Sequence, residues 1–404
     1  MGTWRWIVVP SVAVVAVALA HCLAVTRGSE TGVPGARLPG AASVMEAAAY
    51  PSLQAALDAL PATGGVVRLP PGTFEIDEPL RVKVGDVLIE GAGTSTHIKN
   101  VNTQGRSALL LQHPSGAEDR NAELWRIRLA NFRLTGNPES GHGIEARRIN
   151  EIFIEGVTVS NHGGDGILLH YCYEDPRICD TLITYNEKTG LNLVGCHDIV
   201  VSANQFEENA DALRCSDGFN LCMTGNNLDD HLADGVIIEN TYGSVVCGNM
   251  IEECNGTAIV LDRDCYGITL SANVIAHNGA GIDLRDAHGC AVSANTFTIV
   301  KQDAVRISSN SGRITVCGNN FSDSFIGAGG IKRAASDRAA AGMTLAGAAD
   351  VAIVGNLFSS VRPKGLAVEG EANARVLFSS NLLRDAPSDD DQLDGALVEA
   401  NLRR

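Results

Sequence analysis

Short runs in which apolar and polar residues alternate recur along the chain, and a small residue precedes each run. These small residues lie 22 to 24 positions apart and are Gly143, Gly166, Gly190, Ala212, Gly235, Ala258, Gly281 and Ala304. Alternation with a period of two is typical of a β-strand that buries one face. A fixed spacing of this length indicates a repeat architecture, so we expect the same strand once in every unit.

A second marker, an asparagine followed closely by an apolar residue, keeps the same period. It is present at 204–206, 226–228, 249–251, 273–275 and 295–297, and it continues at Asn320, Asn356 and Asn381. A unit this short cannot bury its own strands, whereas stacked units place each strand beside its equivalent at about 4.8 Å. The sequence therefore predicts an all-β chain folded as a single-stranded parallel β-helix, a solenoid in which the asparagines stack as an amide ladder.

Both ends of the predicted β-helix, residues 44–384, carry signals of their own. The segment 52–60 (SLQAALDAL) has the pattern of an amphipathic helix that begins at a serine cap. Such a capping helix would cover the open edge of the first coil. Residues 385–404 are acidic and follow the last marker, which predicts a C-terminal tail.

The N-terminus predicts export from the cytoplasm. One arginine precedes an apolar run from Ile7 to Ala20, which is the form of a signal peptide or N-terminal anchor over residues 1–25. Residues 26–43 are rich in Gly, Pro and Ala and are expected to form a linker. We therefore expect a secreted or cell-envelope protein that meets a membrane only through such an anchor.

The charge of the chain bears on its binding partners, and its cysteines bear on whether it contains disulfides. The net charge of −16 argues against a nucleic-acid partner, because a phosphate-binding surface needs clustered Lys and Arg. An exported chain permits disulfides. Cys172 and Cys196 fall at equivalent positions of adjacent units, so they form either a disulfide or part of an apolar column of thiols.

The segment 50–93 resembles the entry segment of the pectin-lyase-like right-handed β-helix superfamily, and the Asn and Gly-Ile repeats resemble its parallel β-helix repeats. The resemblance covers about residues 50–383 and implies a right-handed coil. It implies no single reaction, since that superfamily includes lyases, hydrolases, epimerases and non-catalytic proteins.

One unit is a residue or two longer than the others and reads GILLHYCYEDPRICD, from Gly166 to Asp180. Its two tyrosines, Tyr171 and Tyr173, are suited to stacking on sugar rings. The loop resembles the Tyr…Asp-Pro-His-Asp site of bacterial mannuronan C5-epimerases. Asp175 and the proline after it match that motif, but Arg177 stands where the family has its histidine.

The resemblance implies abstraction of the C5 proton of a uronate whose carboxylate is neutralised. In that reading Asp175 and His170 take part in proton transfer, while Arg177 and Arg214 bind the carboxylate. The alternative reading of the same loop is a solvated polar turn between two strands.

A column of aspartates, Asp165, Asp211 and Asp234, precedes the Gly-Ile strands. Asp211 and Asp234 belong to adjacent coils, roughly 5 Å apart, and Asp165 and Asp211 lie two coils apart, roughly 10 Å. Paired carboxylates at such distances suit a glycoside hydrolase. The segment 161–167 (NHGGDGI) also resembles the Asn-Thr-Asp motif of polygalacturonase-type hydrolases. An aspartate before glycine is equally common in turns for backbone reasons alone.

Three functions therefore stay open on the sequence. The first is an exported enzyme that acts on an extracellular polysaccharide by uronate β-elimination or C5-epimerisation. The second is a glycoside hydrolase that uses the paired aspartates, and the third is a non-catalytic envelope or glycan-binding β-helix. The sequence assigns no metal ligand and no certain cofactor. Calcium is the candidate cofactor, because it would bridge this acidic chain to an anionic polysaccharide.

Overall fold

The computed structural model describes residues 41–322, 341–370, 372–393 and 395–404. The predicted signal segment and most of the predicted linker lie outside this range. The chain divides into two units at Ala41, and Ala42–Arg404 forms the stack of coils. No helix among the described residues is long and apolar enough to cross a lipid bilayer.

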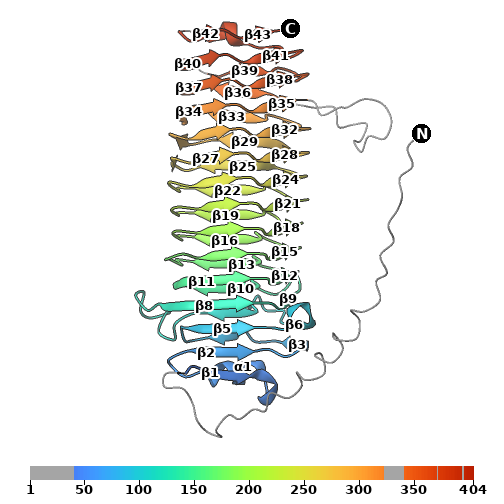
Figure 1. Ribbon diagram of the computed structural model, residues 1–404, viewed down its shortest axis with the longest axis vertical. Coiled ribbons are helices and arrows are strands. Elements are labelled where there is room, and N and C mark those ends of the chain that lie inside the picture. Colours follow the sequence, from blue (N-terminus) through green and yellow to red (C-terminus); the bar gives the residue numbers. More distant parts are fainter. Residues whose placement is uncertain (1–40, 323–340, 371, 394) are drawn as a thin grey trace, which may run out of the picture. The chain divides into compact units, whose positions relative to one another are not determined.

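Three parallel sheets, here named A, B and C, run along the stack (Figure 1). Sheet A contains β1 (Ser43–Glu46), β2 (Gly65–Arg68), β5 (Val87–Glu90), β8 (Leu124–Ala130), β11 (Ile149–Glu155), β14 (Arg177–Cys179), β17 (Val200–Ser202), β20 (Cys222–Thr224), β23 (Val245–Cys247), β26 (Cys265–Tyr266), β27 (Thr269–Ser271), β30 (Ala287–His288), β31 (Ala291–Ser293), β34 (Gly312–Cys317), β37 (Ala349–Val354), β40 (Ala374–Ser379) and β42 (Leu397–Glu399). Sheet B contains β3 (Gly72–Ile76), β6 (Thr96–Asn100), β9 (Arg133–Thr135), β12 (Thr158–Ser160), β15 (Leu182–Thr184), β18 (Gln205–Glu207), β21 (Asn227–Asp229), β24 (Met250–Glu252), β28 (Val274–Ala276), β32 (Thr296–Thr298), β35 (Asn320–Ser322), β38 (Leu357–Ser359), β41 (Leu382–Arg384) and β43 (Leu402–Arg403). Sheet C contains β4 (Leu80–Val82), β7 (Leu109–Leu111), β10 (Ile144–Arg147), β13 (Ile167–His170), β16 (Leu191–Val194), β19 (Leu213–Ser216), β22 (Val236–Glu239), β25 (Thr257–Asp262), β29 (Ala280–Leu284), β33 (Val305–Ser308), β36 (Met343–Ala346) and β39 (Leu366–Glu369).

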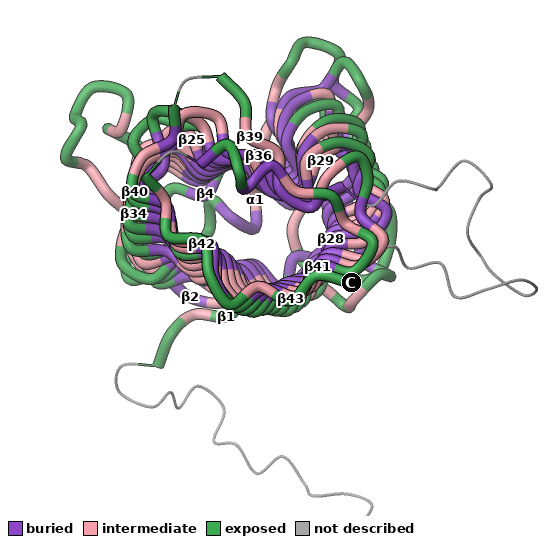
Figure 2. The backbone as a smooth tube through the Cα atoms, turned by 90° about the horizontal axis from the view of Figure 1, so that it is seen from above, coloured by how far each residue is buried: buried purple, intermediate pink, exposed green. Residues whose placement is uncertain are grey.

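The register of the coils explains why the apolar and polar residues alternate. In sheet C, Ile144 pairs with Ile167, Ile167 with Leu191 and Leu191 with Leu213, so equivalent residues form one column. All four side chains are fully buried. Seen along the stack, the buried residues line the inner wall of the coil (Figure 2). The predicted all-β parallel β-helix is therefore confirmed.

The repeated asparagines form the predicted amide ladder at a corner between sheets A and B. The Nδ2 of Asn204 donates to Oδ1 of Asn226 at 3.0 Å, and Nδ2 of Asn226 donates to Oδ1 of Asn249 at 2.9 Å. The ladder continues through Asn273, Asn295, Asn319, Asn356, Asn381 and Asn401. One marker was misplaced, since the ladder uses Asn319 and leaves Asn320 on β35, because an asparagine occupies both positions.

The two ends of the stack differ from each other. Helix α1 (Leu53–Asp58) begins at Ser52, whose Oγ accepts the N–H of Ala55 at 3.1 Å, and its buried side chains face the first coil. Short 3-10 turns lie at η1 (Ala47–Ala49), η2 (Gly93–Ser95) and η3 (Asp390–Gln392). At the other end β42 pairs with β40 and β43 with β41. The prediction of a tail over residues 385–404 is thus wrong, because this segment contributes strands to a further coil.

The ten cysteines among the described residues are all free thiols. Cys172 and Cys196 are fully buried inside the coil. Of the two alternatives for this pair, the structure has the apolar thiols and not the disulfide.

Candidate active site

A cleft of about 460 Å³ opens on the outer face of sheet C, between strands β7, β10 and β13 and the loop 112–123. The polar groups that line it include Arg120, Glu145, Arg147, Arg148 and His170. Three guanidinium groups therefore face one carboxylate and one imidazole. This part of the surface is rich in positive charge although the whole chain carries −16.

The alternation of the strands explains why these side chains meet. Ile144 and Ala146 of β10 point into the coil, so Glu145 and Arg147 point outward. On the next coil Arg147 pairs with His170, the last residue of β13. The cleft is thus assembled from neighbouring positions on adjacent coils.

Glu145 is ionised and His170 is neutral at neutral pH. Burial opposes ionisation of Glu145, but hydrogen bonds from Ser107 Oγ at 2.5 Å and from Arg147 Nε at 2.7 Å outweigh it, and the pKa of Glu145 lies below its ordinary value. The pKa of His170 is also lowered, first by burial and then by repulsion from Arg147 and Arg148. A neutral imidazole in a positively charged cleft is able to accept a proton.

Tyr171 lies at the edge of the cleft toward sheet A. The guanidinium of Arg148 lies 5.0 Å from the centre of the Tyr171 ring, and that ring lies 4.5 Å from the ring of His170. The ring also covers Gly195, where an added Cβ would approach it to 2.5 Å. Tyr173 follows at a ring separation of 6.5 Å.

The loop that contains Asp175 divides between two sheets. Arg177 begins β14 on sheet A, and its guanidinium lies 5.8 Å from the ring centre of Phe153. Asp175 is exposed and lies 3.6 Å from Arg177. The structure therefore brings His170 and Tyr171 to the cleft, whereas Asp175 and Arg177 belong to the neighbouring face.

The aspartate column holds successive coils together. Asp165 Oδ1 accepts the N–H of Thr189 at 3.1 Å, and Asp211 Oδ1 accepts the N–H of Asp234 at 3.1 Å. Asp234 Oδ1 in turn accepts the N–H of Thr257 at 2.6 Å. Each carboxylate thus satisfies a backbone donor of the following coil, and burial raises the pKa of Asp211.

Arg214, predicted to bind substrate, lies between Asp211 of this column and Glu239 at the end of β22. It pairs with Glu239 at 2.8 Å and with Asp211 at 3.8 Å. Arg214 points outward and stands in register with Glu145, three coils further along sheet C. The structure thus places Arg214 on the same face as the cleft but outside its lining.

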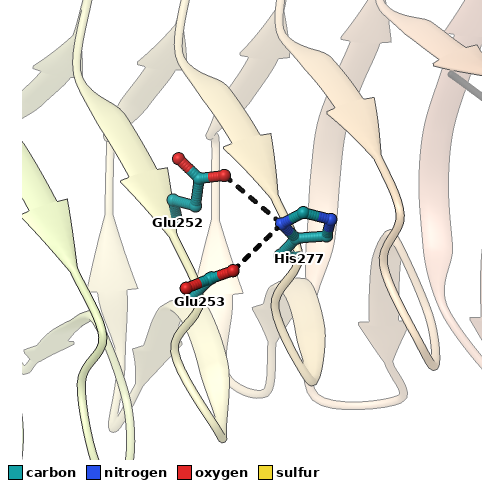
Figure 3. A group of neighbouring side chains, drawn as sticks. All are labelled: Glu252, Glu253 and His277. Carbon is teal, nitrogen blue, oxygen red and sulfur yellow. Dashed lines mark ion pairs between the residues drawn. The ribbon is translucent and has the colours of Figure 1, made fainter. Parts of the chain in front are cut away.

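A group of side chains suited to a metal ion lies on the edge of sheet B. The Nδ1 of His277 lies 3.3 Å from Oε1 of Glu252 and 3.3 Å from Oε1 of Glu253 (Figure 3). Glu253 also joins Asp229 and Asp230 in an all-oxygen group whose donor atoms lie within 4.8 Å of one another. A hydrogen bond to Asp230 raises the pKa of Glu253, and burial raises that of Asp229. Repulsion from neighbouring acids adds to both shifts.

Of the residues predicted from the sequence, His170 lines the cleft and Tyr171 lies beside it, whereas Glu145, Arg147, Arg148 and the loop 112–123 were not predicted. The basic pair at 147–148 occupies the end of the first Gly-Ile strand, in register with His170. The repeat spacing from this strand to His170 could therefore have predicted that the two arginines lie near the histidine. The loop precedes the regular part of the repeat and offered no marker.

Two family models match parts of the chain. One, described as a right-handed β-helix region, matches residues 87–231. The other, described as the periplasmic copper-binding protein NosD, matches residues 187–339. No match was found among curated proteins.

Several solved structures have the same architecture. The A-module of the Azotobacter vinelandii mannuronan C-5 epimerase AlgE6 is 17% identical, with a TM-score of 0.55 over 87% of this chain and 94% of that one. The Agl-KA catalytic domain is 15% identical, with a TM-score of 0.52 over 84% of this chain and 69% of that one. A mutant of the periplasmic alginate epimerase AlgG is 12% identical, with a TM-score of 0.52 over 87% and 83%. The chain is a right-handed parallel β-helix, as its repeats predict.

Proposed function

We propose that the protein acts on an extracytoplasmic polysaccharide and binds a uronate unit in the cleft on sheet C. One observation carries the proposal: Arg120, Arg147 and Arg148 converge with His170 in a single cleft of a chain whose net charge is −16. Guanidinium groups bind carboxylates through paired hydrogen bonds. The positive charge of the cleft therefore attracts an anionic substrate although the chain as a whole is acidic.

The proposed reaction begins with removal of the C5 proton of the uronate. Arginines around the substrate carboxylate stabilise the charge that develops when the C5–H bond breaks. The neutral imidazole of His170 accepts that proton. In β-elimination the electron pair then forms the C4–C5 double bond, and the C4–O bond breaks. The bonding pair leaves with the glycosidic oxygen, which takes a proton from solvent. In epimerisation a proton returns to C5 from the opposite face, and the hydroxyl of Tyr171 is the donor we propose.

The comparisons support this class of reaction and an export route. Two of the similar structures are epimerases of mannuronan or alginate by their titles, and AlgG and NosD are described as periplasmic. We propose the same kind of location for this chain, in agreement with the apolar run at 7–20. The aspartate column gives less support to a hydrolase, because Asp165, Asp211 and Asp234 each bond a backbone N–H.

The test follows exchange at C5 and elimination in one experiment. The purified chain is incubated in D₂O with polymannuronate, polyguluronate and polygalacturonate, with and without calcium. NMR reports deuterium at C5, and ultraviolet absorbance reports unsaturated uronates. Arg148→Ala and His170→Gln should each lower the rate by about 10²-fold or more.

Arg126 provides a matched control for Arg148. Both arginines have a left-handed backbone, with φ of 56° and 54°, and both lie over an aromatic ring. Arg126 is outside the cleft, so Arg126→Ala should leave the rate unchanged. Equal rates in Arg148→Ala and in the parent protein would contradict the proposal, and so would equal losses in the two alanine variants.

A second proposed function is divalent-cation binding at the edge of sheet B, which the match to the NosD model over residues 187–339 favours. Glu252, Glu253 and His277 provide mixed nitrogen and oxygen donors of the kind that Cu²⁺ and Zn²⁺ use. Asp229, Asp230 and Glu253 provide only oxygen donors, which suits Ca²⁺. A cation at either set would offset the repulsion among the stacked carboxylates.

Calorimetric titration with Cu²⁺, Zn²⁺ and Ca²⁺ separates the two donor sets. His277→Asn should weaken Cu²⁺ and Zn²⁺ binding and spare Ca²⁺, whereas Asp229→Asn should do the reverse. His288→Asn is the matched control, because His288 lies 3.3 Å from Asp286 in a similar imidazole–carboxylate pair elsewhere. Uptake that is identical in all four proteins would refute the second function.

A further inference from the structure

A row of aromatic and imidazole rings, which we call the ring row, follows one corner of the coil. It consists of Tyr173, His197, Phe219, Tyr242 and Tyr266, and the last four are linked by parallel bridges from each coil to the next. Successive ring centres lie 4.5, 4.7, 5.3 and 6.5 Å apart. The row thus places one ring on each of five consecutive coils, at the corner between sheets C and A.

The geometry of the ring row differs from that of a structural stack. Inside the coil, Phe297, Phe321 and Phe358 lie face to face at 4.7 to 4.8 Å, with interplanar angles of 2° and 3°, and all three are buried. The rings of the outer row are inclined to one another by 37° to 85°. Phe219 is 40% exposed and Tyr266 51%. The outer rings therefore offer apolar surface to solvent and do not maximise contact with each other.

Polar side chains that suit sugar hydroxyls flank the ring row. Asn220 Nδ2 donates to Asp198 at 2.8 Å, and Asn240 Nδ2 donates to Asp217 at 2.8 Å. The hydroxyl of Tyr242 donates to Oδ1 of Asn240 at 3.2 Å. Rings that contact C–H groups, with amides and carboxylates beside them, form a surface complementary to pyranose sugars.

The ring row is continuous with the cleft. Tyr171 belongs to the cleft edge, and its ring lies 6.5 Å from that of Tyr173, where the row begins. A polysaccharide that leaves the cleft toward the C-terminal coils would therefore meet Tyr173 first. The spacing of the coils, about 4.8 Å, then presents one ring after another along the axis of the stack.

We propose that the ring row binds neutral pyranose units of the same polysaccharide whose uronate unit occupies the cleft. Asp198, beside the row, disfavours a second uronate at these positions, whereas Asp217 is paired with Arg263 at 3.3 Å. The arginines of the cleft favour a uronate in the cleft. The substrate is then a heteropolysaccharide that runs parallel to the axis of the coil. This inference rests on the proposed function for the orientation of the chain, but not for the binding of neutral sugars.

The experiment measures binding of defined hexasaccharides to the full chain by calorimetry. The probes are cellohexaose and mannohexaose, which are neutral, and hexamannuronate, which is anionic. Phe219→Ala and Tyr242→Ala should each weaken binding of at least one neutral hexamer by roughly tenfold and leave hexamannuronate binding unchanged. Tyr185→Ala, which removes a ring that is 45% exposed outside the row, should change neither.

A second substitution guards against a loss of folding. Phe219→Leu keeps an apolar side chain but removes the ring face, so it should weaken neutral binding while the circular dichroism stays that of the parent protein. The inference is overturned if no neutral hexamer binds, or if the ring-row variants and Tyr185→Ala bind all probes alike. Neutral binding that depends on Phe219, without any exchange at C5 of uronates, would refute the proposed function and retain the ring row.

Discussion

Burial of His231 should make the fold sensitive to acid, and His231→Asn should remove that sensitivity. His231 is fully buried, and its Nδ1 lies 3.3 Å from the carbonyl oxygen of Asn209. Burial lowers its pKa from 6.5 to about 4. Asn209 occupies the same position of the preceding coil and bonds to Asn186 as part of a second amide ladder. An asparagine at position 231 therefore extends an arrangement that the coil already contains.

The direction and size follow from proton linkage. The folded state binds fewer protons than the unfolded state between the two pKa values, so stability falls as pH drops through 6.5 toward 4. The loss attributable to His231 is about 2 kcal/mol at pH 5 and approaches about 3.4 kcal/mol below pH 4, at about 1.4 kcal/mol per pKa unit. At pH 8, where the imidazole is neutral in both states, His231→Asn should shift the urea midpoint no more than a typical core substitution does. The advantage of the variant over the parent protein should then grow steadily below pH 6.5.

The assay is urea unfolding, followed by circular dichroism at several pH values from 8 to 4.5. Cys254→Asn is the matched control, because Cys254 is fully buried one coil further along the same column and its pKa is raised to about 12. It introduces the same side chain without removing an imidazole, so its pH profile should run parallel to that of the parent protein. A difference between His231→Asn and the parent protein that stays constant with pH would refute the reasoning.

Three further outcomes are expected. Asn226→Ala leaves ladder donors on the adjoining coil unsatisfied and should lower the free energy of unfolding by about 2 kcal/mol or more, whereas Asn227→Ala on the outer face should change it little, both measured by urea unfolding. Phe321→Ala removes the middle ring of the buried stack and should cost about 3–5 kcal/mol, while Phe321→Leu should retain most of the stability in the same assay. The kcat/KM on a uronate substrate should fall on the acid side as His170 gains a proton, with an apparent pKa below 6.5 that is absent from a His170→Gln profile.

The repeat could be predicted because each coil reads as the same short pattern. A Gly or Ala fixes the start of the sheet C strand, and the ladder asparagine provides an amide that both donates and accepts at a buried corner. The one misplaced marker, Asn320, arose where two asparagines are adjacent. The last coil, within 385–404, was missed because its strands are short and weakly apolar, and Leu397 and Leu402 are both exposed.

The site was only partly predictable because its parts come from irregular segments. Loop 112–123 closes the cleft by its position in space, which no period in the sequence reveals. Asp175 and Arg177 were assigned on a local resemblance, but the left-handed backbone at Glu174 and Asp175 carries the chain past the corner to Arg177, which begins β14 of sheet A. The ring row does carry a signal, since Tyr173, His197 and Phe219 are 24 and 22 residues apart, in step with the glycines.

The asparagine ladder also sets a rule for how this architecture accepts foreign sequence. Asn319 and Asn356 are hydrogen-bonded as direct neighbours although 37 residues separate them, whereas Asn295 and Asn319 are 24 apart. Extra chain therefore enters between two rungs without shifting the alignment on either side. A peptide or a small protein domain inserted between Asn319 and Asn356, within 323–340, should therefore leave the folding of the β-helix unchanged.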